Sequence, residues 1–279
     1  MSKIRVVIII IASAAFVFSA IMLLRTTLQY RAADEEYTGL EQYAKVGGED
    51  PVSTQEAAAE TKADGADDDE TAEEEEKVLA RNYNRADFPD IAVDHEALKK
   101  INSSYVCWLY APGAEINHPV VQTTDNEFYL HHTFEMQNNI AGCVFMDHEV
   151  DPLLTSWNTF FYGHNMKNGS MFGHLKNYIN DKSVYDKYPY IYVFRPEGIY
   201  RYEIFSFYLD PTDSKMYYTC NTFKEYRAYL REATKKSVRE CTAKCDPDLN
   251  IVTLVTCSGS GSNKQRFFVH GVFKDYYLF

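Results

Sequence analysis

The sequence predicts a mostly β protein whose folded part is a mostly antiparallel barrel or sandwich. Runs of β-branched, aromatic and alternating residues indicate about seven to nine short strands. These runs follow one another more often than they follow a helix, which disfavours a doubly wound parallel sheet. One long amphipathic stretch, residues 222–239, predicts a helix inserted before the last two strands, with Thr222 as its cap.

The elements can be placed in order along the chain. The expected strands are residues 105–110, 116–122, 140–146, 157–162, 190–194, 198–209, 250–257 and 265–273. Shorter helical stretches are expected at residues 94–101, 125–130 and 170–178. Pro196, Glu197 and Gly198 form a turn signal that predicts a hairpin between the fifth and sixth strands.

The N-terminus carries a membrane signal. Residues 6–24 contain no charge, follow Lys3 and Arg5, and are long enough to cross a bilayer as a helix. We expect a single-pass anchor that leaves residues 1–5 in the cytoplasm and sends the rest of the chain outside the cell. The alternative is a signal peptide cut after Ala15 or Ala20, but the apolar run continues past both positions to Leu24.

The net charge of -12 comes from one segment. Residues 34–76 hold 17 acidic side chains against Lys45 and Lys62, which leaves a net charge of +3 on the rest of the chain. Such a composition cannot bury enough apolar surface to fold, so residues 25–81 are expected to form a disordered acidic tether with a reach of roughly 30 to 40 Å. The folded domain is then residues 82–279, and it shows no basic face typical of nucleic-acid binding.

Six cysteines raise the question of disulfides in an extracellular chain. Cys107, Cys143 and Cys220 lie in apolar runs and are expected to be small buried hydrophobic residues. Cys241 and Cys245 are spaced for a disulfide or a metal, but no second ligand pair follows at a zinc-like spacing.

Cys257 differs because it ends a predicted strand and is followed by the loop SGSGSNK, residues 258–264. If the strands on either side of this loop pair antiparallel, Arg266 lies next to Cys257. A guanidinium in this position lowers the pKa of a thiol and can stabilise an oxyanion.

A reactive cysteine needs a base, and His164 is the best placed of the eight histidines. It directly follows a strand of bulky residues, and Gly163 before it permits an unusual turn. His95, His118, His148 and His174 have polar neighbours and are expected at the surface, whereas His131 and His132 lie in a helical or loop region. His270 shares a strand face with Arg266 but is about 13 Å further along the strand.

With these residues in view, the chain resembles a class B sortase, a membrane-anchored cysteine transpeptidase of Gram-positive bacteria. The run TLVTC at residues 253–257 matches the TLxTC signature of the family, and Arg266 stands where the essential arginine of the family follows. The runs YGHNM at residues 162–166 and GSMF at residues 169–172 resemble the histidine segment of class B. The resemblance covers roughly residues 94–279 and implies an eight-stranded sortase-type barrel with N-terminal helices.

The resemblance also implies a function and a site. Cys257 would attack the carbonyl after threonine in an NPxT-type C-terminal sorting signal of a secreted protein, with His164 as acid and base and Arg266 as oxyanion stabiliser. An amine from a peptidoglycan precursor or a pilin would then resolve the thioester, and neither metal nor cofactor is required. By position, the peptide groove would be lined by Asn126, Leu130, Tyr217, Tyr218, Val255 and Ser258. Some relatives have serine and an acidic residue where this chain has Val255 and Ser258, so the lining of the groove departs from theirs.

Three other functions use the same features. A hydrolytic cysteine protease would release its product to water, and a pilin-polymerising sortase would differ only in its acceptor amine. A non-catalytic anchored surface domain would keep Cys257 as a buried structural thiol.

Overall fold

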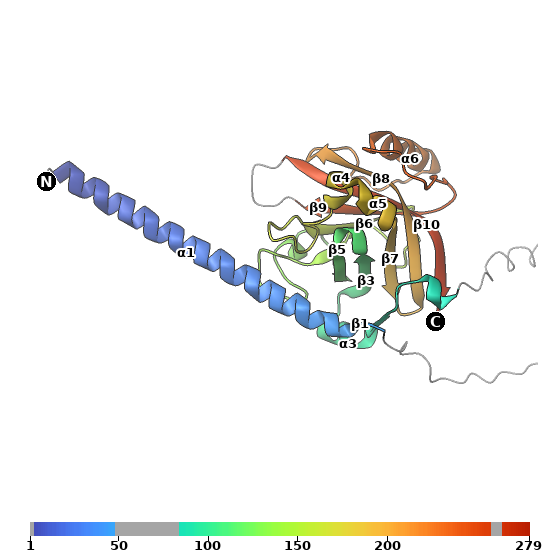
Figure 1. Cartoon of the computed structure of the whole chain (residues 1–279), viewed down its shortest axis with the longest axis horizontal. Helices are drawn as coiled ribbons and strands as arrows, with labels where there is room; N and C mark the ends of the chain where they lie inside the picture. The colour runs from blue at the N-terminus through green and yellow to red at the C-terminus, as the bar shows by residue number, and fades with distance from the viewer. Residues whose placement is uncertain (1–2, 48–83, 258–263) are drawn as a thin grey trace, which may run out of the picture.

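The computed structural model describes residues 3–47, 84–257 and 264–279, and at Cys257 it describes the backbone alone. The described residues form one closed barrel of eight strands, in the order β10-β8-β7-β3-β4-β5-β6-β9, and a separate two-stranded sheet, β1-β2 (Figure 1). The expected eight-stranded, mostly β architecture is therefore confirmed.

The strands of the barrel are β3 (Tyr105–Ala111), β4 (Ile116–Val121), β5 (Val144–Met146), β6 (Asn158–His164), β7 (Tyr190–Arg195), β8 (Gly198–Pro211), β9 (Ile251–Cys257) and β10 (Gln265–Leu278). Most neighbours pair antiparallel, including the hairpin of β7 and β8 and the pair of β9 and β10. Two pairs are parallel, β4 with β5 and β6 with β9. The barrel is thus mixed, and the second parallel pair joins segments that lie far apart in the sequence.

Two expected elements lie elsewhere. The run 140–146 is a strand only at Val144–Met146, because Gly142 has a positive φ of 58° and turns the chain before it. The stretch 170–178 is mostly turns. The short helix α4 (Asn177–Asn180) begins only at its end, and α5 (Lys182–Lys187) comes after it.

The remaining helices agree better with expectation. α3 (His95–Ile101) is capped by Asp94, and α6 (Phe223–Lys236) begins with a capping box between Thr222 and Glu225. α6 buries Tyr226, Tyr229, Leu230 and Ala233 on one face, as its apolar periodicity predicts. Short 3-10 turns η1 (Glu41–Tyr43), η2 (Arg85–Asp87), η3 (Pro112–Ala114) and η4 (Phe128–Leu130) complete the list.

The N-terminal part corrects the expected tether. α1 (Lys3–Leu40) continues far beyond the apolar run and is followed by β1 (Ala44–Val46), which pairs with β2 (Ile91–Val93). The helix is long and apolar enough to span a membrane, and its apolar window is fully exposed. Residues 25–47 are therefore ordered, whereas the rest of the expected tether, residues 48–81, lies outside the described residues.

The cysteines separate largely as expected, except that Cys220 is only partly buried although its apolar neighbours predict burial. Cys107 and Cys143 are fully buried, and burial raises the pKa of each thiol to about 12. Cys220, Cys241 and Cys245 are partly buried, and all five of these cysteines are free thiols. Cys241 and Cys245 thus form no disulfide in this structure.

Several histidines lie deeper than their polar neighbours predict. His118 packs edge-on against Tyr37, and burial lowers the pKa of His118 and of His95 to about 4. His270 is fully buried inside the barrel. Its Nδ1 lies 2.9 Å from the Thr253 hydroxyl, which donates to Asn158, and its Nε2 lies 2.9 Å from the Tyr208 hydroxyl. These bonds are all satisfied by a neutral imidazole that donates from Nδ1 and accepts at Nε2.

This buried imidazole predicts a loss of stability in acid. Burial lowers the pKa of His270 from 6.5 to about 3, so below pH 6.5 the unfolded chain binds a proton that the native chain does not. The contribution is complete above pH 6.5 and falls as the pH drops, by about 2 to 3 kcal/mol at pH 4.5. Denaturant unfolding of the full chain at several pH values measures it.

The control compares two substitutions. His270→Gln should flatten the slope of stability against pH between 6.5 and 4.5, even if it lowers stability at pH 7. Asn138→Gln, at an exposed residue that does not titrate, should leave the slope as it is in the wild type. Equal slopes in all three proteins would contradict the prediction.

Candidate active site

His164 and Cys257 meet at one rim of the barrel because β6 and β9 run parallel and end together. The two strands pair over their whole length, from Asn158 opposite Ile251 to His164 opposite Cys257. Strands whose paired residues are 93 positions apart in the sequence thus bring the two residues to adjacent ends. The hydrogen-bonded neighbours of a sheet lie about 4.8 Å apart, so the two backbones are within side-chain reach.

Arg266 reaches the same rim from the other side of β9. β9 and β10 pair antiparallel with Phe268 opposite Val255, and the Phe267 N–H donates to the Thr256 hydroxyl at 3.0 Å. The paired residues end at Phe268 and Val255, and two more residues along each strand in the same register would bring the backbone of Arg266 next to that of Cys257. The positive charge of Arg266 also acts on His164, whose pKa it helps to lower. The three residues therefore gather on one edge of the barrel.

The imidazole of His164 is held in one orientation. It is only 8% exposed, and its Nε2 lies 2.7 Å from the backbone carbonyl oxygen of Leu130. Because a carbonyl can only accept, Nε2 carries the proton and Nδ1 is the nitrogen that remains for exchange. Burial is the main reason that the pKa of His164 is lowered, with smaller effects of the same sign from His131 and Arg266, while the Leu130 bond raises it.

The ring of His164 also packs against Gly142. A Cβ at this position would come within 2.9 Å of the His164 Cδ2 atom and 2.5 Å of the Tyr129 carbonyl oxygen. Only glycine fits this contact and the positive φ together. The chain before β5 therefore forms one wall of the histidine site.

The Arg266 guanidinium is left available by its neighbours. Its register partner on β8 is Asp210, but the Asp210 carboxylate accepts from Lys236 at 2.9 Å and from the Ser214 hydroxyl. Within the described ranges, no hydrogen bond or ion pair engages the side chain of Arg266. Lys236 of α6 thus pairs with Asp210, which would otherwise be free to pair with Arg266 of β10.

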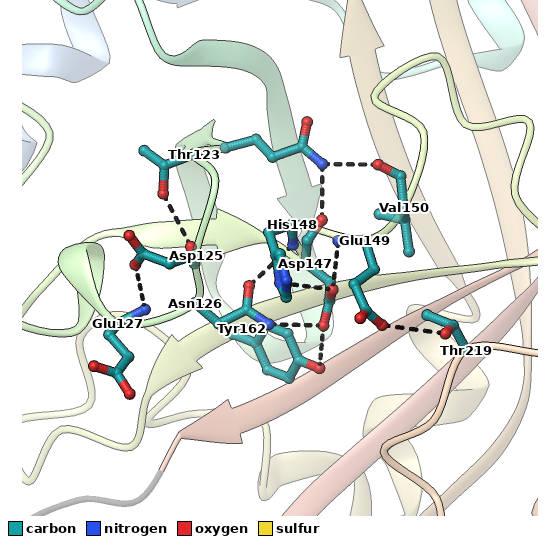
Figure 2. Close-up of polar contacts among 11 residues, drawn as sticks. Thr123, Asp125, Asn126, Glu127, Asp147, His148, Glu149, Val150, Tyr162 and Thr219 are labelled. Atoms are coloured by element: carbon teal, nitrogen blue, oxygen red, sulfur yellow. Dashed lines mark hydrogen bonds and ion pairs between the residues drawn. The ribbon is translucent and has the colours of Figure 1, made fainter.

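Asp147 directly follows β5 and joins several loops through its carboxylate (Figure 2). Its carboxylate accepts from the Asn126 amide at 3.0 Å and from the Tyr162 hydroxyl at 2.9 Å, and Tyr162 lies two residues before His164 on β6. Asn126 also accepts from the His148 N–H at 3.0 Å. Glu149 accepts from Thr219 at 3.3 Å, which connects the loop between β8 and α6 to the same turn.

The six expected groove residues have different surroundings. Asn126 uses both ends of its amide inside the network around Asp147, and Leu130 is half-buried with its carbonyl engaged by His164. Tyr217 packs against Phe268 with ring centroids 5.0 Å apart, and Tyr218 is 39% exposed with its edge against Tyr229. Ser258 lies outside the described residues.

Val255 corrects the sequence analysis. Its side chain is 0% exposed, so it is a core residue of β9 and lines no surface. A position two residues before a strand end is still inside the pleated, doubly covered part of the sheet, and it packs rather than contacts solvent.

Two supporting groups were not predicted. The Leu130 carbonyl and the Asp147 carboxylate hold His164 and its strand, but a backbone oxygen leaves no mark in a sequence. Asp147 follows a buried strand directly, and this position at a strand end is the one signal that would have suggested it.

Comparison with known proteins identifies the family. A family model described as the Sortase domain matches residues 109–274. The chain belongs to the sortase family, whose members are cysteine transpeptidases.

Its named relatives narrow the class to sortase B. The chain is 36% identical over 179 residues to Sortase B of Listeria monocytogenes, covering 62% of this chain and 71% of that one. It is 32% identical over 174 residues to Sortase B of Staphylococcus aureus, covering 61% of this chain and 70% of that one. The crystal structure of Clostridium perfringens sortase B superposes with a TM-score of 0.60 at 31% identity, covering 65% of this chain and all of that one.

Proposed function

We propose that this protein cleaves an NPxT-type sorting signal at the C-terminus of a secreted protein and joins the product to an amine of the cell wall. The observation that carries the proposal is the in-register pairing of His164 with Cys257 at a rim that Arg266 also reaches. A thiol, an imidazole and a free guanidinium in one place are the groups that acyl transfer through a thioester requires.

In the first half of the reaction, the Cys257 sulfur attacks the carbonyl carbon after the threonine and a C–S bond forms. The Arg266 guanidinium stabilises the negative charge that develops on the carbonyl oxygen. As the sulfur attacks, Nδ1 of His164 takes the proton of the Cys257 thiol, and as the C–N bond breaks it passes this proton to the leaving amine. The products are a thioester on Cys257 and the released C-terminal peptide.

In the second half, an acceptor amine attacks the thioester carbonyl, a C–N bond forms and the C–S bond breaks. His164 is now neutral and takes the proton that the amine loses. The lowered pKa of His164 supports this step, because it keeps the imidazole unprotonated at neutral pH.

α1 supports a place of action at the membrane. Its apolar N-terminal part fits a single-pass anchor, and we propose that the barrel lies outside the cell, where secreted substrates and peptidoglycan precursors meet. Of the residues expected in the peptide groove, Leu130, Tyr217 and Tyr218 remain accessible enough to be proposed as contacts, with Asn126 supporting them from the Asp147 network.

Incubation of the full chain in detergent micelles with sorting peptides, with and without small amines, tests the proposal. We expect a thioester on Cys257 by mass spectrometry and a ligated peptide when an amine is present. His164→Ala should remove both. Product released only to water would indicate a hydrolytic protease, and no thiol labelling at Cys257 in the folded protein would indicate a non-catalytic domain. Substitution of a pilin lysine peptide for the wall amine separates the pilin-polymerising alternative.

The pair of Lys236 and Asp210 predicts an effect on turnover. Lys236→Met frees the Asp210 carboxylate to pair with Arg266 directly across the ladder, so the turnover number should fall about two- to fivefold, the range set by a partly exposed ion pair. Peptide cleavage assays measure it. Asp210→Asn in the same chain should restore activity, and Lys235→Met, at the exposed neighbouring lysine, should have no effect.

A further inference from the structure

α1 has two parts with different surroundings. The apolar residues up to Leu24 are exposed, whereas Ala33, Tyr37 and Leu40 are 3%, 7% and 2% exposed. A spacing of four and three residues puts these three side chains on one face of the helix. The C-terminal part of α1 is therefore docked on the barrel, while its N-terminal part extends away from it (Figure 1).

The docked face contacts a segment that we call the histidine wall, residues 130–143. The Tyr37 hydroxyl donates to the Gly142 carbonyl at 2.6 Å and accepts from the Phe134 N–H at 3.3 Å. The Asn139 amide donates to the Gln29 carbonyl at 2.9 Å, and the Glu135 N–H donates to Glu36 at 2.9 Å. Contacts far apart in sequence thus fix the wall to α1 at several points.

The histidine wall is the structure that orients His164. Leu130, at one end of the wall, supplies the carbonyl that fixes Nε2, and Gly142, near the other end, packs on the ring. The loop after His164 is held too, since the Asn168 amide lies 3.2 Å from Asp34 of α1. Tyr37 bonds to Gly142 itself, so a single residue separates the helix from the imidazole.

The acidic segment does not separate α1 from the barrel. The chain has already joined the folded domain before residue 48, since β1 pairs with β2, Gly47 N–H donates to Asp90 and Asp94 N–H donates to Tyr43. Between Leu24 and Tyr37 there is one continuous helix, about 20 Å long.

We propose that residues 25–40 of α1 are a rigid stalk that also positions His164, so that docking of the anchor helix on the histidine wall is needed for full turnover. The proposal rests on the catalytic role proposed for His164. Tyr37 is a positioning residue here, because it acts through Gly142 and not on the substrate.

Two matched substitutions in the full chain, reconstituted in lipid nanodiscs, test the stalk. Ala33→Asp puts a charge into the docked face, and Ala32→Asp puts the same charge on the exposed residue beside it. Ala33→Asp should raise amide exchange of the histidine wall and lower the turnover number about 10- to 100-fold, with a KM close to that of the wild type. Ala32→Asp should match the wild type. Tyr37→Phe keeps the ring and loses both hydrogen bonds, and it serves as the test if Ala33→Asp is too unstable to assay. Its turnover number should lie between the values expected for Ala33→Asp and Ala32→Asp.

Titration of His164 by NMR gives a readout that does not depend on turnover. Ala33→Asp and Tyr37→Phe should move the pKa of His164 upward as its burial is lost, and His131 and Arg266 are the other charged groups that act on it. The stalk proposal would be contradicted if Ala33→Asp left the amide exchange of the histidine wall unchanged. It would also be contradicted if the exchange rose while the pKa of His164 did not move. If the wild type turned over no peptide, the proposed function would be contradicted instead. The titration of His164 would still show whether α1 positions this residue.

Discussion

Cys257→Ala is expected to reduce peptide cleavage by at least about 10⁴-fold, because the only atom proposed to form the thioester is removed. The substitution lies at the end of β9, where the pairing with β6 depends on backbone groups, so the barrel should still fold. Initial rates with a sorting peptide and the mass of the trapped thioester are the measurements.

Cys241→Ala is the matched control, since Cys241 is a partly buried free thiol beyond the end of α6. It should keep the activity of the wild type. Cleavage by Cys257→Ala at a rate near that of the wild type would show that the chemistry does not pass through this sulfur.

Arg266→Lys is expected to lower the turnover number about 10²- to 10³-fold, the cost of losing one oxyanion donor. A single ammonium cannot reproduce the planar fork of a guanidinium, and the shorter reach of its donors leaves the developing charge uncompensated. The loss should fall mainly on the turnover number rather than on KM, because the interaction strengthens in the transition state. Steady-state kinetics with the same peptide separate the two.

Arg227→Lys tests whether any arginine substitution has this effect, since Arg227 lies on α6 against the ring of Phe223. It should be neutral. If Arg266→Lys retained activity within about twofold of the wild type, Arg266 would have no part in stabilising the oxyanion.

Strand patterning predicted a mostly antiparallel barrel or sandwich, because most of the strands carry apolar or alternating runs, and the resemblance to class B sortases implied the eight-stranded barrel. The last two strands and their loop predicted the proximity of Cys257 and Arg266, since a short connection between two strands favours antiparallel pairing. The position of His164 opposite Cys257 could not be predicted in this way. It depends on a parallel pair between distant strands, and only closure of the whole barrel selects that partner.

The errors have common physical causes. Polar neighbours in sequence do not report on burial, so His95 and His118 were expected at the surface although other elements cover them. Composition averaged over residues 34–76 concealed Tyr37 and Leu40, which together with Ala33 dock α1 on the barrel. An apolar face of so few residues does not change the composition of a segment that contains many acidic residues.

The sequence alone determined the local character of this protein: the apolar N-terminal helix, the strands, the capped α6 and the residue types that can perform thiol chemistry, because each depends on neighbours along the chain. Tertiary structure alone decided that His164 rests on the Leu130 carbonyl, that Asp210 is taken by Lys236, and that α1 runs unbroken onto the histidine wall. These contacts join residues that are distant in sequence, and their partners are selected by the packing of the closed barrel.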